Sequence, residues 1–155
     1  MELVVLTKGN KYVIEDQKGR LLYTVKKKGF NSTKYVLLDT SNYNLYTLLQ
    51  TGEDRKPSFA IVLNDATFMT IECKSLFLDP TIVCNGEKTT FTLASKDRRE
   101  FNILLDKEKK GCINTRTSVS GDLQYDIVIE DKIFDDYIPL FAVIIDKAFG
   151  AMNKQ

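Results

Sequence analysis

Residues 137–150 of the chain read "YIPLFAVIIDKAFG". Asp135 and Asp136 precede this stretch, Pro139 lies in its first turn, and Gly150 closes it. Carboxylates suit the positive N-terminal end of a helix and can cap it. Proline is tolerated in a first turn, and glycine commonly ends a helix. The pattern therefore predicts a helix over about 137–149, capped by Asp135 and Asp136 and ended at Gly150.

The apolar residues of this stretch do not form a stripe along one face of the helix. Ile138 and residues 140–145 cover its whole circumference. A helix that is apolar all round must be buried all round. The run is far shorter than the ~20 apolar residues that a membrane span needs. The rest of the chain must therefore surround this helix.

Upstream of the helix, short apolar runs alternate with turn signals such as Lys18-Gly19, Asn64-Asp65 and Lys110-Gly111. Their spacing is close to the ~8–12 residues that is typical of sandwiches and barrels. Between the turns apolar residues recur at every second position, as in Phe101, Ile103 and Leu105. Twelve strands are predicted, near residues 2–7, 11–15, 20–27, 34–39, 44–50, 57–64, 66–74, 81–85, 89–94, 99–105, 111–117 and 122–129.

Many antiparallel strands and one helix that must be surrounded limit the possible architectures. A closed barrel removes exposed strand edges, and a barrel wider than about eight strands leaves room in its interior. The fold expected is mainly β: a closed twelve-stranded antiparallel β-barrel that encloses the hydrophobic C-terminal α-helix. No linker or shift in composition divides the chain, so residues 1–155 are expected to form one domain.

Two stretches of the sequence repeat one pattern at an interval of 23 residues: "IEDQKGRLLYTV" (14–25) and "LLDTSNYNLYTL" (37–48). Each has an Asp followed by a residue that tolerates the left-handed conformation, Gly19 or Asn42. Leu-Tyr-Thr then opens the next strand. The repeat is either one β-hairpin design used twice or a coincidence between two ordinary hairpins. Neither interpretation makes it a binding site.

Composition narrows the classes of function. The chain has no histidine, so it lacks the usual catalytic base, the commonest metal ligand and the physiological pH switch. Its net charge of +1 gives no global attraction for nucleic acid or membrane. Its three cysteines are not a disulfide framework, and no signal peptide is evident. We expect a cytoplasmic protein without a transmembrane segment, with no cofactor and no nucleic-acid partner.

Four segments together resemble a known family. They are the pattern YVI-x-D-x-x-G-x-x-LY-x-V over residues 12–25, "IVCNGEK" (82–88), "FNI" (101–103) and "LFAVIIDKA" (140–148). Their order is similar to that of the LURP-one-related group of the tubby C-terminal-like superfamily, which also includes the phospholipid scramblases. The size of the chain resembles the stand-alone bacterial members. The resemblance implies a twelve-stranded barrel around a central C-terminal helix.

The resemblance implies less about activity. Tubby domains bind phosphoinositides through basic surface residues, and scramblases are tied to membranes and calcium. This chain lacks the tubby C-terminal signature and the Pro-rich and Cys-rich front of scramblases. The resemblance therefore implies lipid binding only as a general property of the superfamily, without a site in this chain.

The densest basic stretch is the strongest candidate for a lipid-binding site. Lys26, Lys27, Lys28 and Lys34 surround Phe30 in one predicted hairpin. Such a loop suits anionic headgroups, since each Lys near such a surface contributes about 1 kcal/mol. The alternative is a solvated hairpin end, where lysines guard against strand pairing.

Other charged clusters favour structural roles. Bases at 96–99 and 107–110 alternate with acids, which indicates a salt-bridged surface rather than a phosphate groove. Glu130, Asp131, Asp135 and Asp136 are a candidate calcium site, with helix capping as the simpler explanation for the last two. Asp146 is interpreted as a polar contact at the barrel mouth.

The three cysteines, Cys73, Cys84 and Cys112, fall in predicted strands. Without histidine they are poor nucleophiles, so all three are expected to be buried small hydrophobic residues.

Three hypotheses follow. The first is a non-enzymatic interaction module that presents loops to anionic lipid at a membrane periphery or to a protein partner. The second is a barrel that carries a hydrophobic small molecule, which needs an empty interior. The third is a carboxylate- or metal-dependent enzyme built on the acidic cluster.

Overall fold

The structure is a computed structural model that describes residues 1–29 and 33–154. Within those ranges, twelve strands precede one helix. The strands are β1 (Glu2–Lys8), β2 (Lys11–Asp16), β3 (Leu21–Lys27), β4 (Lys34–Leu38), β5 (Asn44–Gln50), β6 (Ser58–Leu63), β7 (Ala66–Ser75), β8 (Thr81–Gly86), β9 (Thr90–Ser95), β10 (Glu100–Leu105), β11 (Glu108–Thr117) and β12 (Leu123–Ile129), and the helix is α1 (Pro139–Asn153).

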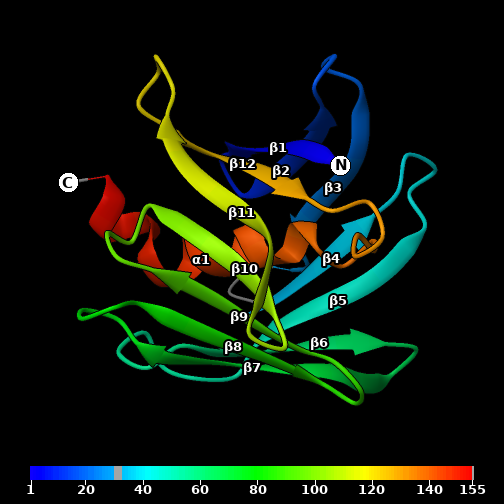
Figure 1. Cartoon of the computed structure of the whole chain (residues 1–155). Helices are drawn as coiled ribbons and strands as arrows, with labels where there is room; N and C mark the ends of the chain where they lie inside the picture. Colours follow the sequence, from blue (N-terminus) through cyan, green and yellow to red (C-terminus); the bar gives the residue numbers. More distant parts are fainter. Residues whose placement is uncertain (30–32, 155) are drawn as a thin grey trace.

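Each strand pairs antiparallel with its neighbour in sequence, and β1 pairs with β12 to close the barrel (Figure 1). Because the strands run up and down in turn, successive connections lie at opposite ends. Connections after odd-numbered strands share one end with the last turn of α1, at the left of Figure 1. Connections after even-numbered strands share the other end with residues 130–138, which lead into α1. We call these the exit end and the entry end.

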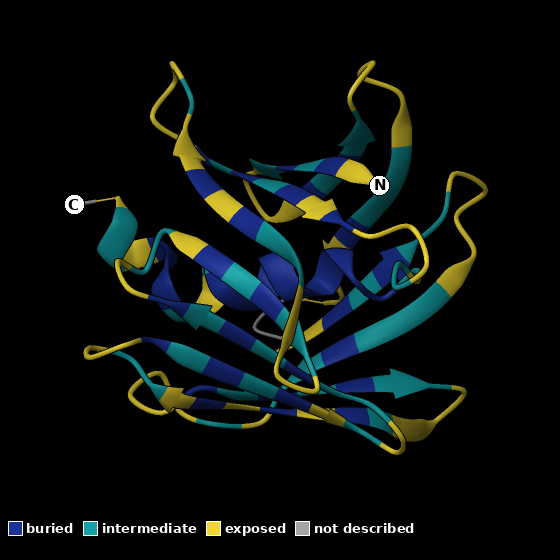
Figure 2. Ribbon diagram, viewed as in Figure 1, coloured by how far each residue is buried: buried dark blue, intermediate teal, exposed yellow. Residues whose placement is uncertain are grey.

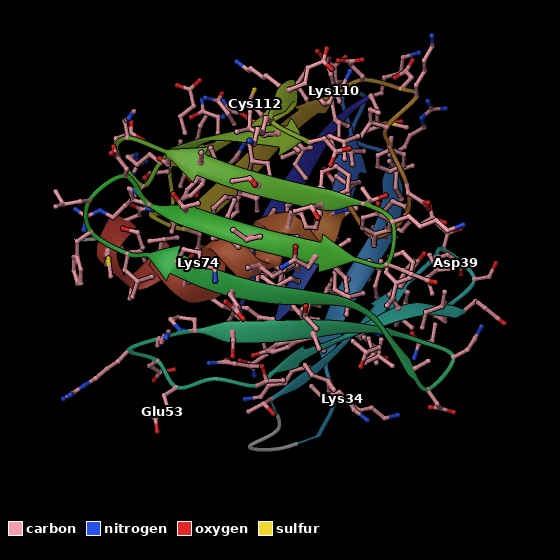
Figure 3. The ribbon with its side chains drawn as sticks, turned by 60° about the horizontal axis from the view of Figure 1, so that its bottom comes forward. Lys34, Asp39, Glu53, Lys74, Lys110 and Cys112 are labelled. Carbon is pink, nitrogen blue, oxygen red and sulfur yellow. The ribbon has the colours of Figure 1, made fainter. Side chains whose placement is uncertain are left out.

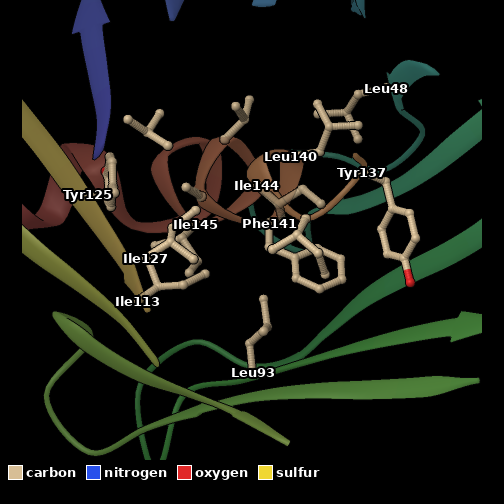
Figure 4. Packing of buried hydrophobic residues seen from close by; sticks show 14 of the residues in the cluster. Leu48, Leu93, Ile113, Tyr125, Ile127, Tyr137, Leu140, Phe141, Ile144 and Ile145 are labelled. Atoms are coloured by element: carbon tan, nitrogen blue, oxygen red, sulfur yellow. The ribbon is translucent and has the colours of Figure 1, made fainter. Parts of the chain in front are cut away.

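The helix fills the barrel. Residues 140–145 are all 0% exposed, and dark blue runs along the helix inside the barrel in Figure 2. Inward positions of the strands meet it, as Leu93, Ile113 and Ile127 do in Figure 4. Edge-on ring contacts add to this packing, with Phe91 and Phe141 centroids 5.3 Å apart. The predicted barrel around a buried C-terminal helix is confirmed.

The ends of the helix differ from the prediction. The helix starts at Pro139 after an N-cap at Ile138 that has no side-chain cap, so Asp135 and Asp136 do not cap it. The helix also continues through Gly150 to Asn153. A Cβ at Gly150 would lie 2.7 Å from an Asp146 carboxylate oxygen, so this glycine leaves room for that side chain.

One predicted turn was also misplaced. The chain turns at Asp106 and Lys107, whose φ values are 49° and 73°, and Gly111 lies inside β11. A Cβ at Gly111 would lie 2.3 Å from the Val128 carbonyl oxygen on β12. The glycine therefore marks a close approach between strands, next to the irregular register of β10 and β11, and β11 starts earlier than predicted.

The repeated stretches are confirmed as turns built on the same hydrogen bonds. Asp16 and Asp39 each accept, through Oδ1, the backbone N–H groups two and four residues later. Each also accepts through its carbonyl oxygen the N–H three residues later. That donor is Gly19 or Asn42, with φ of 78° or 63°. These bonds to Asp16 hold the pKa of its carboxyl below the usual range.

Asp146 ties the helix to the barrel wall. Its carboxylate accepts hydrogen bonds from the Tyr12 hydroxyl on β2 and the Tyr125 hydroxyl on β12, both at 2.6 Å. Burial, followed by the negative charge of Asp146, raises the pKa of both phenols far above the ordinary value of about 10. The interpretation of Asp146 as a polar contact at the barrel mouth is thus confirmed.

Removing helix packing should destabilise the protein strongly. Leu140→Ala deletes a side chain that is 0% exposed and should cost about 2–5 kcal/mol of unfolding free energy. Leu21→Ala makes the same deletion at a position that is 47% exposed, and should cost far less. Urea unfolding of both variants measures the difference, and equal losses would contradict a helix-filled core.

Removing the Asp146 carboxylate should leave two buried phenols without an acceptor. Asp146→Ala should cost about 1.5–3 kcal/mol near neutral pH, the typical value for hydrogen bonds to a charged group. Because the folded-state pKa of each tyrosine is raised, this stabilisation is complete below pH ~10 and is lost as pH rises above it. Urea unfolding and a tyrosine absorbance titration check both effects.

Asp122→Ala removes a carboxylate from an exposed loop at the same end and serves as the control. If the two variants lost equal stability, or if Tyr12 and Tyr125 ionised near pH 10 in the native protein, the proposed tie would be wrong.

Candidate functional site

Charge is distributed unevenly between the two ends of the barrel, although the net charge of the chain is only +1. The exit end carries the bases Lys8, Lys11, Lys26, Lys27, Lys28, Lys34, Arg55, Lys56, Lys74, Lys96, Arg98, Arg99, Lys147 and Lys154. Its acids are Glu53, Asp54, Glu72, Asp79, Asp97, Glu100, Asp122 and Asp146. Positive charge is therefore in excess at this end.

The entry end has the opposite balance. Its acids are Glu2, Glu15, Asp16, Asp39, Asp65, Glu87, Asp106, Glu108, Glu130, Asp131, Asp135 and Asp136. Its bases are Lys18, Arg20, Lys88, Lys107, Lys109, Lys110 and Lys132. The barrel is thus polar along its axis, and Figure 3 shows Lys74 and Asp39 toward opposite ends.

The predicted lipid-binding lysines lie at the exit end. Lys26 and Lys27 end β3, Lys34 begins β4, and the Lys28 N–H donates to the Lys34 carbonyl at 2.9 Å. The structure therefore brings these four lysines together on one exposed hairpin. Phe30, the aromatic residue of the predicted site, lies outside the described residues.

A second basic surface at the exit end was missed by sequence reasoning. A groove of about 270 Å³ lies between the β5–β6 and β7–β8 connections. Arg55, Lys56, Lys74 and Phe77 are among its lining residues. Phe77 is 72% exposed and Leu78 beside it is 86% exposed. We call these five residues the basic groove and its apolar tip.

The Lys74 side chain of the basic groove has one carboxylate partner, which lies outside the lining residues. Glu72 accepts a hydrogen bond from the Lys74 ammonium at 2.6 Å, and Lys74, with a smaller effect from Lys56, lowers the pKa of Glu72. Both side chains of this pair are more than half exposed, so the pair holds little free energy. Lys74 can therefore exchange Glu72 for an external anion at small cost.

The chemistry of the exit end suits an anionic surface. Clustered bases attract such a surface over roughly a Debye length, about 8 Å at physiological salt. Exposed apolar residues at a loop tip can enter the boundary between headgroups and acyl chains.

One sequence signal could have found the basic groove. In an up-and-down barrel every second connection lies at the same end, so the order of the strands alone assigns each charged loop to an end.

The other basic clusters do not form one surface. Residues 96–99 lie at the exit end and residues 107–110 at the entry end, at opposite ends of β10. Lys96 pairs with Asp79 at 3.0 Å and Lys110 with Glu108 at 3.5 Å, as a salt-bridged surface predicts. The Arg99 guanidinium donates to the Asn153 carbonyl at 3.3 Å and so holds the last turn of α1.

The acidic cluster is divided among several partners. Glu130 lies 3.8 Å from the Lys110 ammonium, and Asp131 contacts the Met1 amino group. The Asp135 carboxylate accepts the Asp136 N–H at 2.7 Å, and Asp136 accepts the Tyr23 hydroxyl. Over residues 1–29 and 33–154, the structure brings no three Cys, Asp or Glu side chains together as a metal site.

The cysteines follow the prediction at two of three positions. Cys73 and Cys84 are buried, and burial raises the pKa of the Cys73 thiol to about 12. Cys112 is only half-buried, because it alternates with the inward-facing Ile113 and so lies on the outer face of β11. The prediction of a buried Cys112 was wrong.

The hydrophobic-carrier hypothesis needs an empty interior, but α1 occupies that space. Among the described residues, no helix is long and apolar enough to cross a bilayer.

Comparison with known proteins identifies the family. No curated protein matches the sequence significantly. A solved X-ray structure of a protein from Arabidopsis thaliana is similar, with 19% identity over 98% of this chain and 90% of the other, at a TM-score of 0.45. The model of the LURP-one-related family matches residues 2–146. With a closed twelve-stranded barrel around one C-terminal helix, consistent with a tubby-like fold, the chain belongs to the LURP-one-related family.

Proposed function

We propose that this protein is a non-enzymatic module that docks peripherally on anionic phospholipid through the exit end of its barrel. The observation that carries the proposal is one groove lined by Arg55, Lys56 and Lys74 together with the exposed Phe77. The exposed Leu78 follows Phe77 in the chain. Bases that attract headgroups and an apolar tip that enters the bilayer boundary are the two parts of a peripheral membrane site.

Two further features support this orientation. The Lys26–Lys28 and Lys34 hairpin lies at the same end, so a planar membrane can meet both basic surfaces. The excess of carboxylates lies at the opposite end, where it repels an anionic surface least. The absence of histidine from the sequence supports binding rather than catalysis.

Neutralising the basic groove should weaken docking. The variant Arg55→Gln/Lys56→Gln/Lys74→Gln removes three charges, each contributing about 1 kcal/mol near an anionic membrane, so affinity should fall roughly a hundredfold. Flotation with phosphatidylserine-containing vesicles measures the loss, and binding should also weaken as salt rises. Vesicles of phosphatidylcholine alone should bind little protein.

The matched control is Lys18→Gln/Lys107→Gln/Lys132→Gln, which removes the same charge from exposed positions at the entry end. It should leave flotation nearly unchanged. Phe77→Ser/Leu78→Ser removes the apolar tip, so it should weaken the part of the vesicle binding that high salt does not abolish. If both triple variants lost equal affinity, docking would have no preferred end. If the unaltered protein failed to float with the vesicles, the lipid proposal would be wrong. A module that binds a protein partner would then be the remaining hypothesis.

A further inference from the structure

A second pocket opens at the entry end, far from the basic groove. It has a volume of about 380 Å³ and lies between the start of β7, at Thr67–Met69, and the β8–β9 turn, at Gly86–Thr89. Tyr137, just before α1, forms part of its lining. Gly86 occupies an inward-facing position of β8 without a side chain, and a Cβ there would approach the Met69 methyl to 3.6 Å. The volume is at the small end of the ~300–1,000 Å³ usual for ligand sites.

The Tyr137 hydroxyl is left without a protein partner in this pocket. Tyr137 is only 7% exposed, its ring packs against Phe68 and Phe141, and its hydroxyl points away from the helix in Figure 4. No residue in the described ranges forms a hydrogen bond with this hydroxyl, whereas the buried phenols of Tyr12 and Tyr125 each have Asp146. Burial, helped by the nearby Asp135 charge, raises the pKa of Tyr137 to about 12. The pocket therefore presents a neutral phenol whose oxygen can accept or donate a hydrogen bond.

Two carboxylates and an aromatic ring lie near this pocket. Glu87 lines the pocket, and Asp135 lies close enough to Tyr137 and Tyr46 to act on both phenols. The rings of Phe68 and Tyr137 have centroids 5.2 Å apart and both line the pocket. Lys88 is the one base among the lining residues. The surrounding end of the barrel carries the excess of acids described above.

An ammonium group suits the phenol oxygen, the carboxylates and the aromatic rings together. It donates hydrogen bonds to a phenol oxygen, it is attracted to carboxylates, and it is stabilised over an aromatic face. An anion would be repelled by Glu87 and Asp135, and a purely apolar molecule would leave the hydroxyl unpaired. We propose that the pocket between β7 and the β8–β9 turn binds a small organic amine, with its ammonium at the Tyr137 hydroxyl and its apolar part against Phe68 and Met69.

A titration with three matched probes tests this proposal on the full chain. Benzylamine, benzyl alcohol and benzoate share a ring and differ in charge. In ¹⁵N–¹H NMR spectra at pH 7, benzylamine should shift the amides of residues 67–69 and 86–89 at the lowest concentration, benzyl alcohol should need more, and benzoate should shift none of them.

Two single substitutions and one control give the test its specificity. Tyr137→Phe keeps the ring packing and removes the hydroxyl, so benzylamine affinity should fall roughly 2–10-fold. Glu87→Gln should weaken benzylamine roughly 2–5-fold and leave benzyl alcohol unchanged. Asp106→Asn removes the same charge from another turn at the entry end, where φ is 49° and Asn is tolerated, and should change neither.

Three results would overturn the proposal. Equal binding of the three probes would show an unselective apolar pocket. Equal weakening by Asp106→Asn and Glu87→Gln would show attraction to the acidic end as a whole. Absence of shifts at residues 67–69 and 86–89 with millimolar benzylamine would show that the pocket takes no amine. None of these results bears on vesicle flotation, which depends on the opposite end.

Discussion

Burial of one helix on every side governs how the strands of this protein are arranged. Residues 140–145 have no exposed surface, and apolar area of this kind stabilises only if other elements surround it completely. Twelve strands closed by the β1–β12 pairing provide that enclosure, and this pairing joins the two edges of the sheet. Asp146 is the polar exception: it fixes the depth of the helix through Tyr12 and Tyr125 without leaving a buried charge unpaired.

Closure by an up-and-down meander has a consequence for function. It separates the connections into two sets, so a chain with almost no net charge can present a basic surface at one end and an acidic one at the other. The interior is already filled by α1, so recognition is left to the ends. In our account the exit end meets an anionic membrane, and the entry end holds a small pocket beside Tyr137.

Most of the fold could be predicted from the sequence, because two patterns of apolar residues determine it. Apolar and polar residues alternate in the strands, and apolar residues cover every side of the helix. The errors arose at two glycines whose role is set by a group that packs against them. Gly150 and Gly111 read locally as a helix end and a turn, but each makes room for another group, the Asp146 side chain or the β12 backbone. The candidate site was predicted less well, since Arg55 and Lys56 lie in the β5–β6 connection and Lys74 lies near the end of β7, and only the barrel brings them together.

The barrel and its helix should form one cooperative unit, and native-state amide hydrogen exchange can show whether they do. Amides of residues 140–145 should exchange only through global unfolding, with an opening free energy equal to that from urea unfolding. They should also be among the slowest in the chain. Opening of the helix at a free energy well below the global value would show that the helix can leave an intact barrel, and the two would then not be one cooperative unit.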